Sequence, residues 1–84
     1  MGSELDGAGF RSKEFGWRVR QLRQGKGLGL GEVSAAVGLS GFGSIHAMEA
    51  GKKRRLPGPL RLGLLAAALG TTQRDLIEAA GYEV

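Results

Sequence analysis

Residues 30–50 read LGEVSAAVGLSGFGSIHAMEA, and the first half of this stretch predicts a short amphipathic helix. Leu30, Val33 and Val37 recur at spacings of three and four, so they fall on one face of a helix. Gly38 follows directly, and helices commonly end before a glycine because glycine accepts a positive φ angle. The pattern therefore predicts a helix that begins at about Leu30 and ends at Val37.

The second half of the stretch predicts a turn and another short helix. Glycines punctuate residues 39–43, which is typical of a turn. Ile45 and Met48 then lie one helical turn apart, and a glycine stops the pattern. We expect this helix to span about residues 44–50, and we expect Phe42 to pack into the turn as an apolar plug.

Together the two halves satisfy the physical requirements of a helix-turn-helix. The first helix needs a small residue where the second crosses it closely, and Ser34 provides one. The turn needs a residue that accepts positive φ, which Gly38 does. The second helix needs two apolar anchors, Ile45 and Met48, so that its other face is free to enter a major groove.

Three further helices flank this stretch, each with apolar residues at helical spacing. They span about residues 12–25, 60–69 and 73–80. We expect Ser12 to cap the helix at 12–25 and Thr72 to cap the helix at 73–80. Pro59 is expected to take the first position of the helix at 60–69. No stretch shows the alternation of a strand, so the predicted fold class is all-α with five short helices.

Length and composition limit the chain to one small domain of 84 residues. Residues 1–11 hold three glycines and no helical period, so we expect a flexible N-terminal arm before a helix-turn-helix domain over residues 12–84. No apolar run approaches the ~20 residues that cross a bilayer, so no membrane partner is expected. The absence of cysteine suits the cytoplasm, which is the expected location.

Catalysis and cofactor binding find no support in the residue types. There is no cysteine, and the single histidine, His46, has no carboxylates clustered beside it. No nucleophile–base set or carboxylate pair is present either. We therefore predict that the protein is not an enzyme, holds no metal or other cofactor, and takes no small-molecule ligand.

The positive charge is concentrated where it can meet a polyanion. The net charge is +4, and Lys52, Lys53, Arg54 and Arg55 form an unbroken run. This basic run follows the second helix of the helix-turn-helix directly. Such placement favours contact with the phosphates of a nucleic acid.

The motifs together resemble the phage repressor/Cro-like (Xre-type) helix-turn-helix domains, over roughly residues 15–82. The stretches that carry the resemblance are FGWRVRQLR at 15–23, LGLGEVSAAVGLS at 28–40, IHAMEAGKK at 45–53, LAAALG at 65–70 and AAGY at 79–82. The turn before Ile45 is one residue longer than is usual there, and the loop after Gly51 is about two residues longer. Gly29 stands where a serine or threonine cap is preferred.

The resemblance implies a five-helix, lambda repressor-like DNA-binding fold whose third helix lies in the major groove of double-stranded DNA. The candidates for base contacts are the residues of this helix that face away from the core: Gly43, Ser44, His46, Ala47 and Ala50. They lack the arginine and asparagine side chains that give most direct readout. We therefore expect few base contacts, supplemented by recognition of DNA shape.

The expected phosphate contacts come from three places. These are the basic run, the start of the helix over residues 30–37 and the end of the helix over residues 12–25. The candidates are Gly29, Gly31, Lys52, Lys53, Arg54, Arg55 and Arg23. The two glycines are included because free amide groups at the start of a helix attract phosphate.

The helix over residues 60–69 is apolar on more than one side, which suggests a second subunit. The candidates for a dimer interface are Leu60, Leu64, Ile77, Tyr82 and Val84. A symmetric homodimer would read a two-fold DNA site. The alternative to a dimer interface is that other helices of the same chain cover these residues.

Two functions from different classes follow from these features. The first is sequence-preferring binding of double-stranded DNA by a transcriptional regulator, a repressor that acts by occlusion. The alternative is a helical interaction module that binds a toxin, a polymerase or another protein, with DNA binding secondary. The sparse base-reading side chains and the apolar face of the fourth helix motivate this alternative, and DNA binding remains the leading hypothesis.

Overall fold

The computed structural model describes residues 9–83, which contain five α-helices and no strand. The helices are α1 (Ser12–Gly25), α2 (Leu30–Val37), α3 (Gly43–Glu49), α4 (Pro59–Leu69) and α5 (Gln73–Ala79). The predicted all-α fold class is confirmed. Within the same residues, no helix combines the length and the apolar character that crossing a membrane requires.

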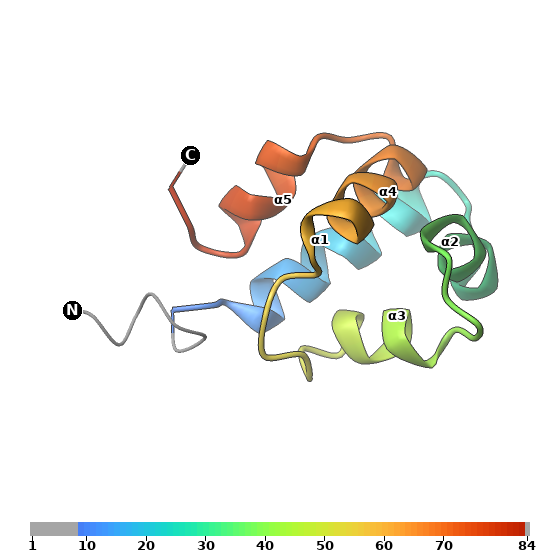
Figure 1. Ribbon diagram of the computed structural model, residues 1–84, viewed down its shortest axis with the longest axis horizontal. Coiled ribbons are helices and arrows are strands. Elements are labelled where there is room, and N and C mark those ends of the chain that lie inside the picture. The colour runs from blue at the N-terminus through green and yellow to red at the C-terminus, as the bar shows by residue number, and fades with distance from the viewer. Residues whose placement is uncertain (1–8, 84) are drawn as a thin grey trace.

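The helices are arranged around α1, with α3 and α5 packed against it and lying on opposite sides of it in Figure 1. Helix α2 contacts both α3 and α4, at the end of the molecule away from the chain termini. Helix α3 therefore lies along one edge of the molecule, with one side against α1 and α2 and the other side open.

The core is built from the predicted apolar stripes. Phe15 and Val19 of α1 are fully buried, as are Ile45, Leu65 and Leu76 from the helices packed around it. Burial of such large apolar side chains is the dominant favourable contribution to folding.

Phe10 also belongs to this core, although the sequence analysis placed it in a flexible arm. Its ring centroid lies 5.5 Å from that of Phe15. The backbone N–H of Arg11 donates to the carbonyl of Ala80, at 2.9 Å. Phe10 and Arg11 are therefore part of the folded domain, and residues 1–8 of the expected arm lie outside the described residues.

The helix ends follow the predicted caps with one exception. Gly38 and Gly70 end α2 and α4 with φ angles of 81° and 71°. The Thr72 hydroxyl accepts a hydrogen bond from the N–H of Asp75, at 3.0 Å. Ser12, in contrast, is the first residue of α1 and not its cap, because Arg11 holds the cap position without a side-chain hydrogen bond.

An ion pair joins α1 to α5. The Arg18 guanidinium donates to both carboxylate oxygens of Asp75, at 3.1 Å each. These hydrogen bonds lower the pKa of Asp75, and the Thr71 hydroxyl and the positive charge of Arg18 act in the same direction, while burial opposes them. The Asp75 carboxylate thus holds α5 against α1, while the backbone N–H of the same residue donates to the Thr72 cap.

Candidate nucleic-acid interface

The crossing of α2 and α3 has the predicted construction. Ser34 is buried at the crossing, and its hydroxyl has no hydrogen-bond partner among the described residues. After Gly38, the N–H of Leu39 donates back to the Ser34 carbonyl, at 2.8 Å, which closes the end of α2. The two anchors of α3, Ile45 and Met48, are both buried. These contacts hold α3 at a set angle to α2.

Gly16 of α1 lies directly beneath the C-terminal end of α3. A Cβ atom at this position would collide with the carbonyl oxygen of Met48 and would lie 2.9 Å from that of Glu49. The backbones of α1 and α3 therefore approach as closely as they do only because residue 16 has no side chain. Gly16 was not predicted as a functional position, because nothing in the sequence shows which helix crosses α1 there.

An ion pair between Arg23 and Glu49 joins α1 to α3, in addition to the close backbone contact at Gly16. The Arg23 Nε and Nη2 atoms donate to the two Glu49 oxygens at 2.6 and 2.9 Å, and Nη1 donates to the Leu28 carbonyl at 2.8 Å. The side chains are only 13% and 8% exposed. The hydrogen bond to Glu49 raises the pKa of Arg23, with its negative charge adding to the effect and burial opposing it.

This geometry changes the role expected of Arg23. Each of its three guanidinium nitrogens is engaged inside the protein, so it is not arranged to meet a phosphate. Arg23 positions α3 and is removed from the candidate contacts.

The outward face of α3 carries most of the predicted base contacts. Gly43, His46 and Ala50 are exposed and Ala47 is half-buried, whereas Ser44 faces the space between α3 and α4 and not the outward face, contrary to the expectation. His46 and Ala50 line a depression of about 280 Å³ together with Arg20 of α1. Arg20 was not predicted, since its nearness to α3 depends on how α1 and α3 pack.

The start of α3 differs from the prediction in two respects. The helix begins at Gly43, one residue earlier than expected. Phe42 does not plug the turn: its side chain is 58% exposed. Its carbonyl instead accepts a hydrogen bond from the N–H of His46, at 2.9 Å, so Phe42 begins the first turn of α3. The longer turn leaves an aromatic ring in solvent beside the outward face of the helix.

The basic run is held at both ends. Gly51 has a φ angle of 74°, and the N–H of Lys52 donates to the Ala47 carbonyl at 2.9 Å. At the other end, Leu56 packs against the core. Lys52, Arg54 and Arg55 are exposed and Lys53 is half-buried. The loop leaves the C-terminal end of α3 along the same edge of the molecule (Figure 1).

The N-terminus of α2 offers less to a phosphate than expected. The N–H of Gly29 is not free, because it donates to the Glu32 carboxylate at 2.8 Å. The carboxylate also places a negative charge where the phosphate would approach. Gly29 is thus removed from the candidates, while Gly31 is exposed in the first turn.

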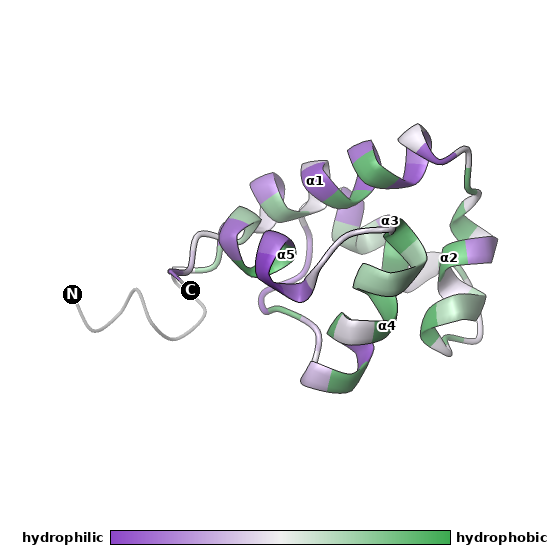
Figure 2. Cartoon of the chain, turned by 90° about the horizontal axis from the view of Figure 1, so that it is seen from above, coloured by the Kyte–Doolittle hydropathy of each residue, from purple (hydrophilic) through white to green (hydrophobic). Residues whose placement is uncertain are grey.

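The candidate dimer residues fall into two groups. Leu60 and Leu64 of α4 are exposed, Leu60 to 78%. Figure 2 shows that α4 is hydrophobic along most of its length. Ile77 and Tyr82 are half-buried and pack against the core of their own chain. Val84 lies outside the described residues.

Two of the three comparisons with known proteins gave no match: none of the protein-family models matches the chain, and none of the curated proteins does. Among solved structures, the chain is similar to the restriction-modification controller protein C.AhdI from Aeromonas hydrophila. The two share 31% sequence identity at a TM-score of 0.65, and the match covers 76% of this chain and 92% of that chain. This chain therefore belongs to the Cro/Xre-like helix-turn-helix family, as its sequence pattern indicated.

Proposed function

We propose that this protein is a transcriptional regulator that binds double-stranded DNA through α2 and α3. The observation that carries the proposal is the arrangement of α3, whose anchors Ile45 and Met48 face the core while His46 and Ala50 face solvent. The basic run begins three positions after the last residue of this helix. The similarity to a controller protein supports the same function.

In the proposed complex, α3 lies in the major groove and the basic run contacts phosphates beside it. His46 offers a single hydrogen bond to a base edge, and Ala47 and Ala50 offer methyl groups to thymine. The exposed ring of Phe42 adds an apolar surface at the start of the helix. Affinity then comes mainly from phosphate contacts, and sequence preference from few base contacts together with DNA shape.

A homodimer is the second part of the proposal. One α3 carries too few base-reading side chains to select a site alone, and a two-fold site doubles their number. Repression needs only occupancy of such a site near a promoter.

A fluorescence anisotropy titration of random and selected DNA duplexes, repeated across salt concentrations, tests this proposal. If the four cations of the basic run each neutralise a phosphate, log K falls with log salt at a slope of about −4 per monomer. A selected duplex should bind more tightly than a random one at the same salt. Absence of binding at low salt would contradict the proposal.

The alternative, a module that binds another protein, rests on the exposed leucines of α4. Leu60 and Leu64 lie four positions apart on α4, at 78% and 40% exposure, so they share one face, and neighbouring exposed apolar side chains of this kind can mark an interaction site. The same titration separates the two functions: an interaction module would bind duplexes weakly and without preference for any selected sequence.

A further inference from the structure

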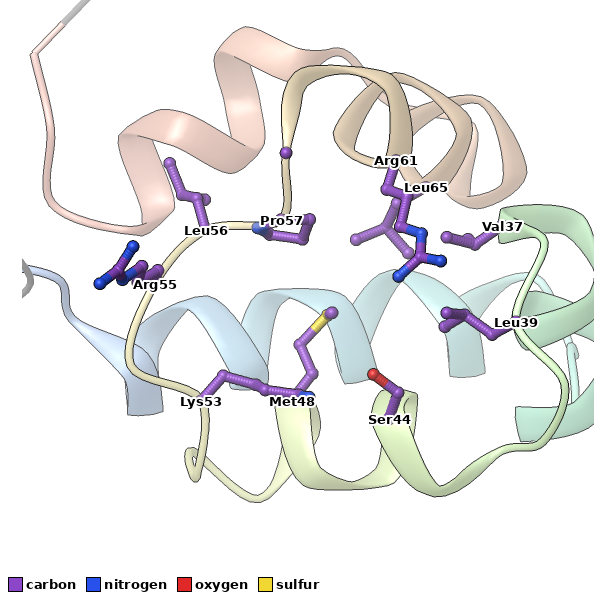
Figure 3. A pocket seen from close by; sticks show the side chains of 11 residues that line it. Val37, Leu39, Ser44, Met48, Lys53, Arg55, Leu56, Pro57, Arg61 and Leu65 are labelled. Carbon is purple, nitrogen blue, oxygen red and sulfur yellow. The ribbon is translucent and has the colours of Figure 1, made fainter.

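A cavity of about 220 Å³ lies between α3, α4 and the loop that joins them. Its inner wall is apolar, with Val37, Met48 and Leu65 contributing from α2, α3 and α4. Leu56 and Pro57 close the side that the loop forms (Figure 3). The cavity is open to solvent on its remaining side and is separate from the outward face of α3 that carries His46.

Three cations line this cavity, and no carboxylate does: Lys53 and Arg55 from the loop and Arg61 from α4. In Figure 3 the Arg61 guanidinium points across the cavity toward the Ser44 hydroxyl, while Lys53 extends along α3 toward Met48. Within residues 9–83, no hydrogen bond or ion pair engages the Arg61 guanidinium.

The position of Arg61 is unfavourable for the helix that carries it. Arg61 lies in the first turn of α4, where the positive end of the helix dipole repels a cation. A negatively charged group in the cavity would relieve this repulsion, and it would be attracted by Lys53 as well, whereas the Arg55 side chain points away from the cavity in Figure 3. The cavity therefore combines an apolar wall with a strong preference for an anion.

We propose that, contrary to the expectation from the sequence that the protein takes no small-molecule ligand, this cavity binds a small carboxylic acid with an apolar body. An apolar cavity of about 150 Å³ is large enough to hold benzene, so the volume here suits a ring-sized body with one acidic group. The carboxylate would accept two parallel hydrogen bonds from the Arg61 guanidinium and one from the Ser44 hydroxyl. The apolar body would lie against Met48 and Leu65.

Occupancy of the cavity would also lower the affinity for DNA, a consequence that rests on the proposed function. The acid neutralises the charge of Lys53, which is a candidate phosphate contact directly after α3. The protein would then release DNA in response to an aromatic or similarly compact acid.

An NMR titration of the isotope-labelled protein with benzoate, without DNA, tests the site itself. We expect saturable shifts in the amides that line the cavity, in α3, the loop and the first turn of α4. Benzyl alcohol has the apolar body without the charge, and acetate has the charge without the body. Each should bind at least about tenfold more weakly than benzoate, because the site needs both parts.

Two variants make the test specific. Arg61→Gln should weaken benzoate binding by about tenfold or more, since it removes the charged donor. Arg74→Gln removes the same charge from the exposed side of α5, away from the cavity, and should leave the affinity unchanged. Circular dichroism checks that each variant is folded.

Three results would overturn the site: no shifts with benzoate, equal binding of benzyl alcohol, or equal weakening by Arg61→Gln and Arg74→Gln.

The DNA titration is then repeated with saturating benzoate. Weaker DNA binding by the parent chain, but not by Arg61→Gln, is the expected result. Benzoate binding in a protein that binds no DNA would uphold the site and contradict the proposed function alone.

Discussion

Arg23 was predicted to contact DNA phosphates from the surface, but in the structure it forms an ion pair within the protein. It lies in the last turn of α1, among other basic residues, which is where a phosphate contact is expected. Its guanidinium instead forms a nearly buried pair with Glu49 on α3. A buried pair of this kind contributes little by itself, but loss of one partner leaves the other charge uncompensated.

We expect Arg23→Gln to lower the free energy of unfolding by about 3 kcal/mol, because Glu49 then remains buried without its partner. Urea denaturation at neutral pH measures the change. Arg20→Gln is the matched control on the same helix, and as an exposed substitution it should stay within about 0.5 kcal/mol of the parent. Unchanged stability of Arg23→Gln with a reduced salt slope of DNA binding would restore Arg23 as a phosphate contact.

Asp75 gives the protein an acid-dependent contribution to stability. Because its pKa is lowered in the folded state, this contribution is present above the unfolded pKa of about 3.9 and is lost as pH falls through the folded pKa. The pair is partly exposed, at 37% for Arg18 and 29% for Asp75, which limits its strength.

We therefore expect Asp75→Asn to destabilise the protein by at most about 1 kcal/mol at pH 7. The difference from the parent should shrink as pH falls from about 5 toward 2, as thermal melts across this range would show. Glu78→Gln is the control, since the pair of Glu78 with Arg74 is exposed and 4.0 Å long. A difference that stays constant with pH would mean that the charge of Asp75 does not stabilise the fold.

At the scale of elements, the placement of α3 depends on Gly16. A glycine inside a helix ordinarily costs about 0.5–1 kcal/mol relative to alanine. Here the cost is offset, because α3 packs its backbone onto the bare Cα of Gly16.

We expect Gly16→Ala to destabilise the protein by about 1–3 kcal/mol, as overpacking does elsewhere. Gly31→Ala is the matched control, because a Cβ at Gly31 of α2 meets no atom within 4 Å. It should leave stability unchanged or raise it by up to about 1 kcal/mol. Equal effects of the two substitutions, measured by urea denaturation, would mean that α1 and α3 are not in such close contact.

The helix α3 and the basic run should have separable roles in DNA binding. Replacing Lys52 and Lys53 with alanine should weaken binding to all duplexes alike and reduce the salt slope by about 2. His46→Ala should change the preference among duplexes and leave the slope nearly unchanged. Anisotropy titrations of both variants on selected and random duplexes measure this, and a changed preference in the lysine variant would contradict the assignment.

At the scale of the whole molecule, the exposed leucines of α4 are the best candidates for a dimer interface. We expect the double substitution Leu60→Glu and Leu64→Glu to shift the protein toward monomer in sedimentation experiments, since it places charges in the apolar contact. Trp17→Gln is the control, as Trp17 is another large exposed side chain but lies on α1. A parent chain that is monomeric at high concentration would refute the dimer.

Much of the architecture follows from local patterns in the sequence. The bounds of α2 were predicted to the residue, because Gly38 ends the helix through its own backbone preference. Pro59, Gly70 and Thr72 mark helix ends for equally local reasons. The exposure of His46 and Ala50 likewise follows once Ile45 and Met48 are known to be anchors.

The sequence alone determined five helices, a helix-turn-helix and a basic run after it, since spacing and capping act within a few residues. Only the tertiary structure decided which charged and aromatic side chains remain available. Arg23 pairs with Glu49, which is 26 positions away in the chain. Phe42 is exposed to solvent, whereas Phe10 is buried in the core. Such outcomes depend on which helices cross and how closely, and crossing is set by contacts between residues far apart in the chain.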